Sequence, residues 1–320
     1  MILHKNEELF KELILATAQE LGLPSLYIEK DYWVTYILKS LSKSEYNNRV
    51  IFKGGTALSK ADKIIERFSE DIDLAIITQG LGSNQIKKLI KKVESAILDD
   101  NFLEDKKHKL SSKGSEFRKT VHHYPKLEDG DFGHAIESII LEINSFAKPY
   151  PFGLREISCY IADFVLPRVP NMLKEYQLES FKINVLDIRR TFCEKLSAVA
   201  RASYESDKDF LTLKEKIRHL YDIYFLMQKR EIIEFLNSDE FIKLMKIVRS
   251  DDIAQFESKW ASNPLYSTTL FLDTDMVLDR LQRYYKTVFA SLVYGNNLPK
   301  IDDIKIEIIK IAKILRETQI

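Results

Sequence analysis

Two aspartates separated by one residue, Asp71 and Asp73, are the side chains in this sequence best suited to chemistry. They begin the apolar run D-I-D-L-A-I-I, which predicts a β-strand over residues 71–77. Because successive side chains on a strand point to opposite faces, both carboxylates are expected on one face and Ile72 and Leu74 on the other. Two carboxylates held close together repel each other unless a cation compensates them. The spacing therefore indicates a divalent ion that prefers oxygen ligands, Mg²⁺ or Mn²⁺.

A pair of glycines precedes the aspartates in the chain. Gly54 and Gly55 follow the apolar stretch at residues 50–52 and are followed by Thr56. Glycines between a strand and a helix let backbone N–H groups approach a phosphate closely, because no Cβ is in the way. Each feature alone has an ordinary explanation, a turn for the glycines and a solvated strand for the aspartates. Their order within one strand-helix-strand unit favours a nucleoside triphosphate held through a metal.

Further elements must position these residues, and their periodicity differs between the two parts of the chain. Residues 1–186 mix helices and strands, whereas almost everything from 187 to 320 has helical periodicity, so a domain boundary is expected near residue 186. Helices are predicted over residues 6–21, 25–41, 83–98, 187–204, 213–229, 232–248, 274–294 and 302–317. Strands are predicted over residues 50–52, 71–77, 116–124, 136–146, 157–162 and 181–185.

Two of the predicted C-terminal helices carry charged residues of interest. Lys195 stands among apolar residues, and a lysine there can bind a phosphate as a compact point charge. Arg218 and Asp222 are four positions apart and so share a helix face, where a simple exposed salt bridge is the alternative.

Several segments resemble the nucleotidyltransferase toxins of the AbiEii/AbiGii type, which are MenT-like relatives of the polymerase-β-like superfamily. The resemblance rests on F-K-G-G-T at residues 52–56 and R-F-S-E-D-I-D-L at residues 67–74. Three more segments extend it, I-E-K-D-Y-W-V-T at 28–35, F-C-E-K-L at 192–196 and R-H-L-Y-D at 218–222. The resemblance implies an α+β fold, in which a polymerase-β-like domain with a mixed sheet flanked by helices (1–186) precedes a mostly helical C-terminal domain (187–320) that completes the active site.

The same resemblance assigns roles to individual residues. A third carboxylate is expected from the strand at 136–146, where alternation favours Glu142, with Glu137 as a competitor and an exposed strand residue as the other alternative. Lys195 would bind the triphosphate and Asp222 would orient Lys195 or the acceptor. The implied metal ligands are Asp71, Asp73 and Glu142, and the implied catalytic residues are these three together with Lys195 and Asp222. The implied nucleotide-binding residues are Gly54, Gly55, Thr56, Ser69, Lys195 and Arg218. His219 departs from the family pattern, because many members have an acidic residue there.

The implied function is a metal-dependent toxin of a toxin–antitoxin or abortive phage-infection system. It would transfer a nucleotide from an NTP to an RNA hydroxyl, with the tRNA 3′ end as the leading acceptor and an antitoxin as partner. Two alternatives are a nucleotidyltransferase that acts on a protein or small-molecule hydroxyl, and a non-catalytic module that binds a nucleotide or a partner.

Composition limits the remaining possibilities. The 320 residues include 48 basic and 48 acidic side chains, so an RNA-binding surface must be a local patch. Lys87, Lys88, Lys91 and Lys92 could form such a patch or a merely solvated helix face. The two cysteines form no disulfide or zinc pattern, and His122 and His123 lack metal-ligand spacing. No apolar run approaches the roughly 20 residues of a membrane span. A cytoplasmic enzyme is expected.

Overall fold

The computed structural model describes residues 1–69, 71–127, 137–204, 210–256, 263–294 and 297–320. The chain divides into two compact units. The first comprises residues 1–63 and 68–186, and the second comprises residues 64–67 and 187–320. The short segment 64–67 thus belongs to the second unit, which the sequence pattern did not indicate.

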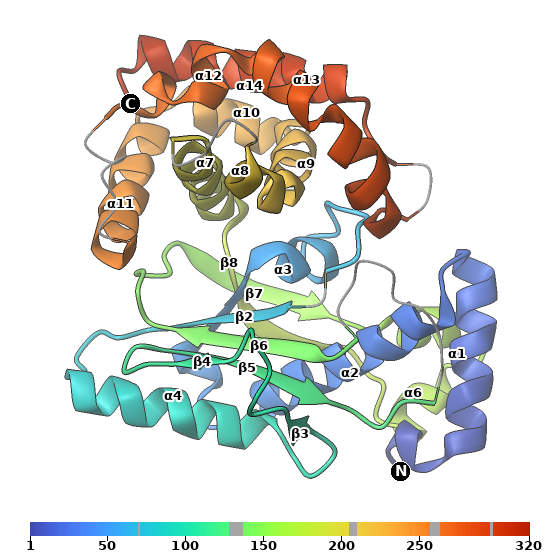
Figure 1. Cartoon of the computed structure of the whole chain (residues 1–320). Helices are drawn as coiled ribbons and strands as arrows, with labels where there is room; N and C mark the ends of the chain where they lie inside the picture. The colour runs from blue at the N-terminus through green and yellow to red at the C-terminus, as the bar shows by residue number, and fades with distance from the viewer. Residues whose placement is uncertain (70, 128–136, 205–209, 257–262, 295–296) are drawn as a thin grey trace. The chain divides into compact units, whose positions relative to one another are not determined.

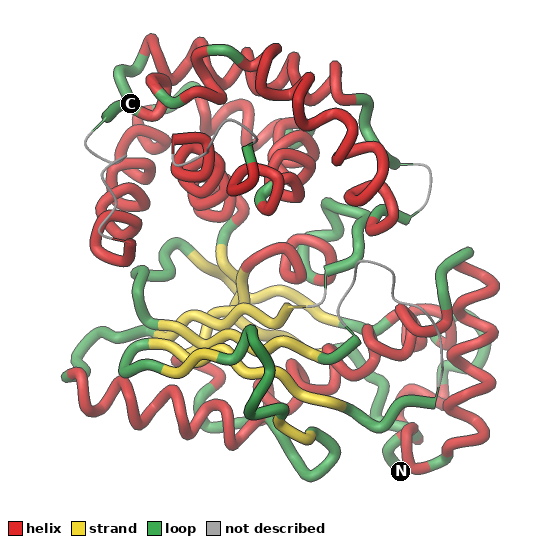
Figure 2. Tube along the Cα trace, in the orientation of Figure 1, coloured by secondary structure: helices red, strands yellow, loops and turns green. Residues whose placement is uncertain are grey.

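A mixed β-sheet forms the centre of the first unit (Figure 1). In the described part of the chain its strands are β1 (Val50–Lys53), β2 (Asp71–Ile76), β3 (Leu103–Glu104), β4 (Ser112–Lys113), β5 (Phe117–His123), β6 (Ile139–Asn144), β7 (Phe152–Ile157) and β8 (Phe181–Leu186). Their order is β3-β5-β6-β2-β1-β8-β7, with β4 paired to β5. β1 and β2 are antiparallel, whereas β2 pairs with β6 and β1 with β8 in parallel. This mixed sheet with its flanking helices, shown as yellow and red tubes in Figure 2, confirms the predicted α+β class.

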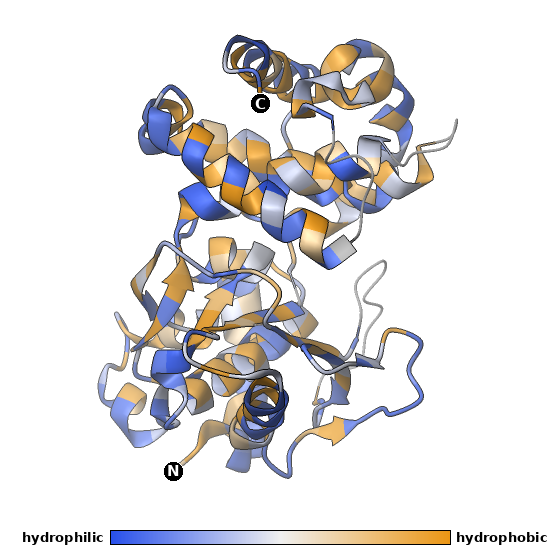
Figure 3. Ribbon diagram, turned by 90° about the vertical axis from the view of Figure 1, so that its left-hand side faces the viewer, coloured by the Kyte–Doolittle hydropathy of each residue, from blue (hydrophilic) through white to orange (hydrophobic). Residues whose placement is uncertain are grey.

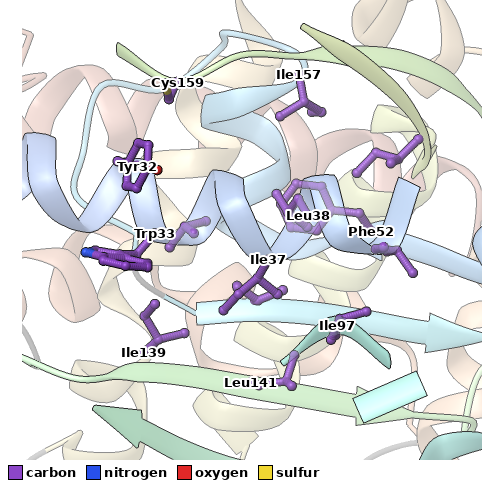
Figure 4. Packing of buried hydrophobic residues seen from close by; sticks show 14 of the residues in the cluster. Tyr32, Trp33, Ile37, Leu38, Phe52, Ile97, Ile139, Leu141, Ile157 and Cys159 are labelled. Carbon is purple, nitrogen blue, oxygen red and sulfur yellow. The ribbon is translucent and has the colours of Figure 1, made fainter. Parts of the chain in front are cut away.

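Helices α2 (Ser25–Lys43) and α4 (Ser83–Ile97) pack on one face of the sheet. Figure 4 shows the core that they form, in which Trp33 and Ile37 of α2 lie close to Ile139 and Leu141 of β6. Ile72, Leu74 and Ile76 of β2 belong to the same cluster. Because side chains alternate along a strand, Asp71 and Asp73 point to the opposite face. That face carries only a small apolar cluster among the described residues, made by Ile51, Ala75, Ile77 and Leu186.

The remaining helices of this unit are short or peripheral. They are α1 (Glu7–Leu21), α3 (Gly54–Lys60), α5 (Tyr160–Val165) and α6 (Asn171–Glu175). α1 begins where the Asn6 side chain accepts a hydrogen bond from the Leu9 N–H (3.3 Å), and it ends at Gly22 in the left-handed region (φ 64°). α4 is preceded by Gly82 at its N-cap position, where the Gly82 N–H donates to Gln85 Oε1 (2.8 Å).

The predicted strand over residues 157–162 is wrong. β7 ends at Ile157, and α5 starts at Tyr160 after Cys159, whose Sγ accepts a hydrogen bond from the Ala162 N–H (3.4 Å). The Tyr160 N–H donates to Asp31 Oδ2 (2.9 Å), a partner 129 positions away. A tertiary contact therefore helps to satisfy the first turn of this helix, which local periodicity cannot reveal.

The second unit is helical. Its helices are α7 (Ile188–Tyr204), α8 (Leu211–Glu215), α9 (Ile217–Met227), α10 (Arg230–Leu236), α11 (Asp239–Phe256), α12 (Thr269–Leu272), α13 (Thr274–Tyr284) and α14 (Ile301–Glu317). Hydrophobic and hydrophilic residues alternate along them (Figure 3), as expected for helices that bury one side. The predicted helix 232–248 is divided because Asn237 Nδ2 and Ser238 Oγ donate to the carbonyls of Ile233 (2.8 Å) and Phe235 (2.7 Å) and compete with the helical pattern.

Candidate active site

Asp73 and Glu142 are direct neighbours on parallel strands. The register pairs Asp73 of β2 with Glu142 of β6, and Asp71 with Ile140. Residues paired in this way point to the same face of a sheet, so Glu142 shares the face of Asp71 and Asp73. The structure thus brings together on one sheet face the three carboxylates that the sequence singled out.

Gly54 packs directly against this carboxylate face. It adopts φ 81°, a backbone conformation that glycine tolerates and other residues rarely adopt. A Cβ atom on Gly54 would lie 2.1 Å from Asp73 Oδ2, so no larger residue fits without displacing the carboxylate. The lack of a side chain at the start of α3 therefore allows the Asp73 carboxylate to lie directly against the backbone of the glycine turn.

Thr56 connects the glycine turn to the aspartate strand. Its buried hydroxyl donates to the carbonyl oxygen of Asp71 (2.6 Å) and is hydrogen-bonded to Ser69 Oγ (2.9 Å). Both hydroxyls are therefore engaged within the protein, and they fix the start of β2 relative to α3.

The two candidate third carboxylates differ in their surroundings. Glu142 is about one-third exposed on the central strand β6, where its Oε2 lies 3.4 Å from Lys119 Nζ of β5 and its Oε1 accepts from Asn144 Nδ2 (3.3 Å). Glu137 lies on a bend before β6, is 54% exposed and pairs with Lys126. Position in the sheet therefore favours Glu142.

The donor set on β2 fits a hard divalent cation. Carboxylate oxygens are the ligands that Mg²⁺ and Mn²⁺ prefer, and Asp71, Asp73 and Glu142 lie on the same face of neighbouring strands. Within the described residues, no three His, Cys, Asp or Glu side chains converge as a ready-made metal site, and Glu142 pairs with Lys119 instead.

A buried charge cluster lies within the second unit. Asp222 of α9 is fully buried and accepts hydrogen bonds from Arg67 Nε (2.7 Å) and Nη2 (2.8 Å) and from Lys195 Nζ (2.6 Å). Lys195 of α7 is itself almost completely buried. One carboxylate thus orients two cations that come from distant parts of the sequence.

Opposing effects set the charge states in this cluster. Burial alone would raise the pKa of Asp222, but Arg67 and Lys195 outweigh it and hold the pKa far below its usual range. Burial lowers the pKa of Lys195, and the attraction to Asp222 counteracts this only in part. Asp222 is therefore an anion at any physiological pH.

His219 and Arg218 are neighbours of Lys195. His219 Nδ1 lies 3.4 Å from Lys195 Nζ, and burial, followed by the charge of Lys195, lowers the pKa of His219 well below its usual value. The imidazole of His219 is therefore neutral beside the Lys195 amine. Arg218 is partly buried, and its charge also lowers the pKa of Lys195.

Arg67 is the site residue that the sequence analysis did not single out. It belongs to the R-F-S-E-D-I-D-L segment, yet its partner Asp222 is 155 positions away. Arg67 itself is part of the second unit, in which it forms a bridge to Val293, and the carbonyl of the preceding Glu66 accepts a hydrogen bond from the Tyr294 N–H (3.1 Å). A positive charge four residues before Asp71 was the one available signal.

Other residues from the sequence analysis lie elsewhere. Lys87, Lys88, Lys91 and Lys92 are exposed on α4, which packs on the sheet face opposite to Asp71 and Asp73. His122 contacts Thr120, and His123 contacts Ser138. The two cysteines are buried free thiols.

A cavity of about 170 Å³ lies between α2 and residues 177–181, and Tyr36, Lys39 and Phe181 are among its lining residues. None of the predicted site residues lines it.

A mixed sheet with a D-x-D strand beside a Gly-Gly turn is typical of the nucleotidyltransferase class. A family model described as "Nucleotidyl transferase AbiEii toxin, Type IV TA system" matches residues 36–306. The chain belongs to this family and is a nucleotidyltransferase of a type IV toxin–antitoxin system. The family implies an NTP substrate and an antitoxin partner. Membership favours an enzyme over the non-catalytic alternative.

A solved structure shows the same fold. MenT4, a nucleotidyltransferase toxin from Mycobacterium tuberculosis H37Rv, is similar with a TM-score of 0.57 and 15% sequence identity, covering 96% of this chain and 91% of that chain. No protein of curated function matches the sequence. Among the described residues, no helix has the length and apolar character needed to cross a membrane.

Proposed function

We propose that this protein transfers a nucleoside monophosphate from an NTP to an RNA hydroxyl, and that its acceptor is the 3′ end of tRNA. The observation that carries the proposal is the register of β2 and β6, which places Glu142 beside Asp73 on the face that also carries Asp71. Three carboxylates on one sheet face, with Asp73 in direct contact with the glycine turn, suit a metal-dependent transfer between phosphate oxygens.

Asp71, Asp73 and Glu142 would hold Mg²⁺ or Mn²⁺. When bound, the cation neutralises the triphosphate and the charge that develops on the attacking and leaving oxygens. Glu142 takes the proton from the acceptor hydroxyl, which attacks the α-phosphorus in line with the leaving pyrophosphate. The backbone at Gly54 and Gly55 lies against the phosphates, and Thr56 and Ser69 fix this turn to β2.

The buried cluster of the second unit supplies positive charge. Lys195 binds the β- or γ-phosphate, and Asp222 keeps its amine in place, as the 2.6 Å contact between them supports. Arg67 donates a hydrogen bond to the same Asp222 carboxylate and so holds in place the group that positions the Lys195 amine. Arg218, which is partly buried and whose charge lowers the pKa of Lys195, is a further proposed ligand of the triphosphate.

Membership of a toxin family supports the proposed acceptor and the proposed biological role. Addition of nucleotides to the tRNA 3′ end would block aminoacylation and stop growth, which suits a cytoplasmic toxin in an abortive defence against phage. A protein or small-molecule hydroxyl is the competing acceptor, and labelling with a radioactive NTP distinguishes it from an RNA hydroxyl.

The test incubates the purified protein with Mg²⁺, one α-³²P-labelled NTP at a time, and total bacterial tRNA. The Asp71→Ala/Asp73→Ala variant is the control for the carboxylates, and tRNA oxidised with periodate is the control for the 3′ hydroxyl. We expect label on intact tRNA with the wild type alone. Label on periodate-treated tRNA would move the acceptor away from the 3′ end, and label only on protein or small molecules in a lysate would overturn the RNA assignment.

A further inference from the structure

The I-E-K-D-Y-W-V-T segment at residues 28–35 has no part in the proposed transfer mechanism, although it contains three charged side chains, Glu29, Lys30 and Asp31. It lies in the first half of α2, where Tyr27, Lys30 and Asp31 occupy positions i, i+3 and i+4 and so share one helix face. These three residues are called the α2 contact face below. The core residues Trp33 and Ile37 are separate from it and pack toward the sheet.

Asp31 ties this face to the helix that starts with the glycines. Its Oδ1 forms an ion pair with Lys60, the last residue of α3, and both side chains are about nine-tenths buried. Its Oδ2 accepts the Tyr160 N–H (2.9 Å), so both oxygens of the carboxylate are in use. Removing one partner of an ion pair buried to this extent leaves an uncompensated charge. The Asp31–Lys60 pair therefore favours a single arrangement of α2 and α3.

Tyr27 and Lys30 hold the segment that leads into β2. The ring of Tyr27 stacks on Phe68, with centroids 3.9 Å apart and planes 16° apart. Lys30 Nζ lies 5.3 Å from the centroid of the Phe68 ring. Phe68 is adjacent to Ser69, whose hydroxyl is bonded to Thr56. One helix face thus contacts both chain segments that meet at Gly54 and Asp73.

We propose that Asp31, together with Tyr27 and Lys30, is a positioning residue for nucleotidyl transfer. The α2 contact face fixes α3 through Lys60 and the Phe68–Ser69 segment through Phe68, and thereby sets the distance between the glycine turn and the Asp71–Asp73 strand. The proposal rests on the proposed function, because a change in this distance would lower the rate of nucleotidyl transfer. A displacement of about 1 Å at a reacting centre is enough to lower a rate by on the order of 100-fold.

Asp31→Asn is the decisive variant. The amide oxygen still accepts the Tyr160 N–H, whereas the charge opposite Lys60 is lost. Glu94→Gln is the matched control, because Glu94 also accepts two hydrogen bonds, from Arg118 and from Thr120 Oγ1 (3.0 Å), and its ion pair is similarly buried. That pair joins α4 to β5 and contacts neither segment. Melting temperature, kcat and KM for the NTP are measured for both variants.

We expect Asp31→Asn to lower kcat by on the order of 100-fold with a smaller change in KM, and Glu94→Gln to lower the melting temperature equally while kcat stays at the wild-type value. Lys60→Met should lower kcat as much as Asp31→Asn does, and the double variant should have no lower kcat than either single variant. Lys60→Arg should have a higher kcat than Lys60→Met, because it keeps a cation opposite Asp31. If Asp31→Asn does not fold, Lys60→Met decides, because it removes the same ion pair and keeps the hydrogen bond from the Tyr160 N–H to Asp31. Lys60 Nζ also lies 5.7 Å from the centroid of the Tyr160 ring, and Lys60→Arg keeps a cation at that position. Equal kcat in the Asp31 and Glu94 variants would overturn the proposal.

Hydrogen exchange of the peptide covering residues 54–60 provides a readout that does not depend on the acceptor. Exchange should be faster in Asp31→Asn than in the wild type and unchanged in Glu94→Gln. Unchanged exchange in Asp31→Asn would overturn the positioning role even if the enzyme is active. A wild-type protein that labels no RNA would instead overturn the proposed function, while faster exchange in Asp31→Asn would still support the α2 contact face.

Discussion

Gly54 and Asp73 are in such close contact that a single methyl group on the glycine would overlap the aspartate, with its carbon 2.1 Å from Oδ2. Gly54 is therefore required both for its backbone conformation and for its lack of a side chain. The two requirements can be separated experimentally, because other glycines of this chain also have a positive φ but have room for a side chain.

Gly54→Ala should abolish transfer. The added methyl group must displace the Asp73 carboxylate, and the positive φ adds a strain of about 1–2 kcal/mol. Gly80→Ala is the control, because Gly80 has nearly the same φ (79°) and nothing within 4 Å of an added Cβ. Both variants should lose stability in thermal melts from the backbone strain, Gly54→Ala at least as much as Gly80→Ala, and only Gly54→Ala should lose activity. An active Gly54→Ala enzyme would remove this glycine from the site.

Exchanging one carboxylate at a time identifies the third metal ligand. Glu142→Gln should lower transfer by on the order of 100-fold or more, since a proton acceptor and a ligand are lost together. Glu137→Gln should have no effect, because Glu137 is on an exposed bend paired with Lys126. Mn²⁺ affinity, measured by electron paramagnetic resonance, gives a readout besides activity. A fully active Glu142→Gln variant would leave a site with two carboxylates.

Asp73→Ala should abolish transfer and leave the fold intact. Removal of this carboxylate takes away a ligand and also relieves its repulsion with Asp71, so the melting temperature should stay the same or rise. Mn²⁺ binding should weaken in parallel with activity. A variant that loses its cooperative melt would mean that the aspartate pair is structural.

The sequence was sufficient for the central part of this arrangement. Alternation along β2 separates Asp71 and Asp73 from Ile72 and Leu74, and this local rule holds because one sheet face is buried. This feature depends on neighbours in the chain, which a sequence displays directly. Alternation also made Glu142 a candidate, but it left Glu137 as a competitor, and the pairing of β2 with β6 that favours Glu142 is not visible in the sequence.

Long-range contacts account for what was missed. Arg67 acquires its role from Asp222, 155 residues later, and α5 starts where Asp31 accepts the Tyr160 N–H. The contact between Tyr27 and Phe68 similarly joins residues 41 positions apart in the numbering. Periodicity cannot report such pairs, since a charged residue that will be buried has the same local pattern as one that stays in solvent.

Asp222→Asn should destabilise the second unit by about 3–5 kcal/mol at pH 7, because Arg67 and Lys195 stay buried without their anion. The pKa of Asp222 is lowered in the folded state, so its contribution is fully present above the unfolded value of about 3.9. It is lost as the pH falls below that value toward the folded pKa. The stability difference between wild type and variant, measured by denaturant unfolding from pH 7 to pH 3, should therefore shrink at the acid end. A difference that is independent of pH would contradict this assignment.

Lys195→Met should weaken NTP binding and transfer together. A charge-assisted contact to a phosphate contributes about 1.5–3 kcal/mol, which corresponds to a rise of about 10–100-fold in the dissociation constant of the NTP. Stability should suffer less than in Asp222→Asn, since Asp222 keeps its two hydrogen bonds from Arg67. Arg190→Met is the control, because it removes another buried cation from the same helix, one that pairs with Glu194 and Asp251. Calorimetric titration with a non-hydrolysable NTP should show weaker binding for Lys195→Met alone; equal affinities in the two variants would mean that Lys195 serves the buried cluster and not the triphosphate.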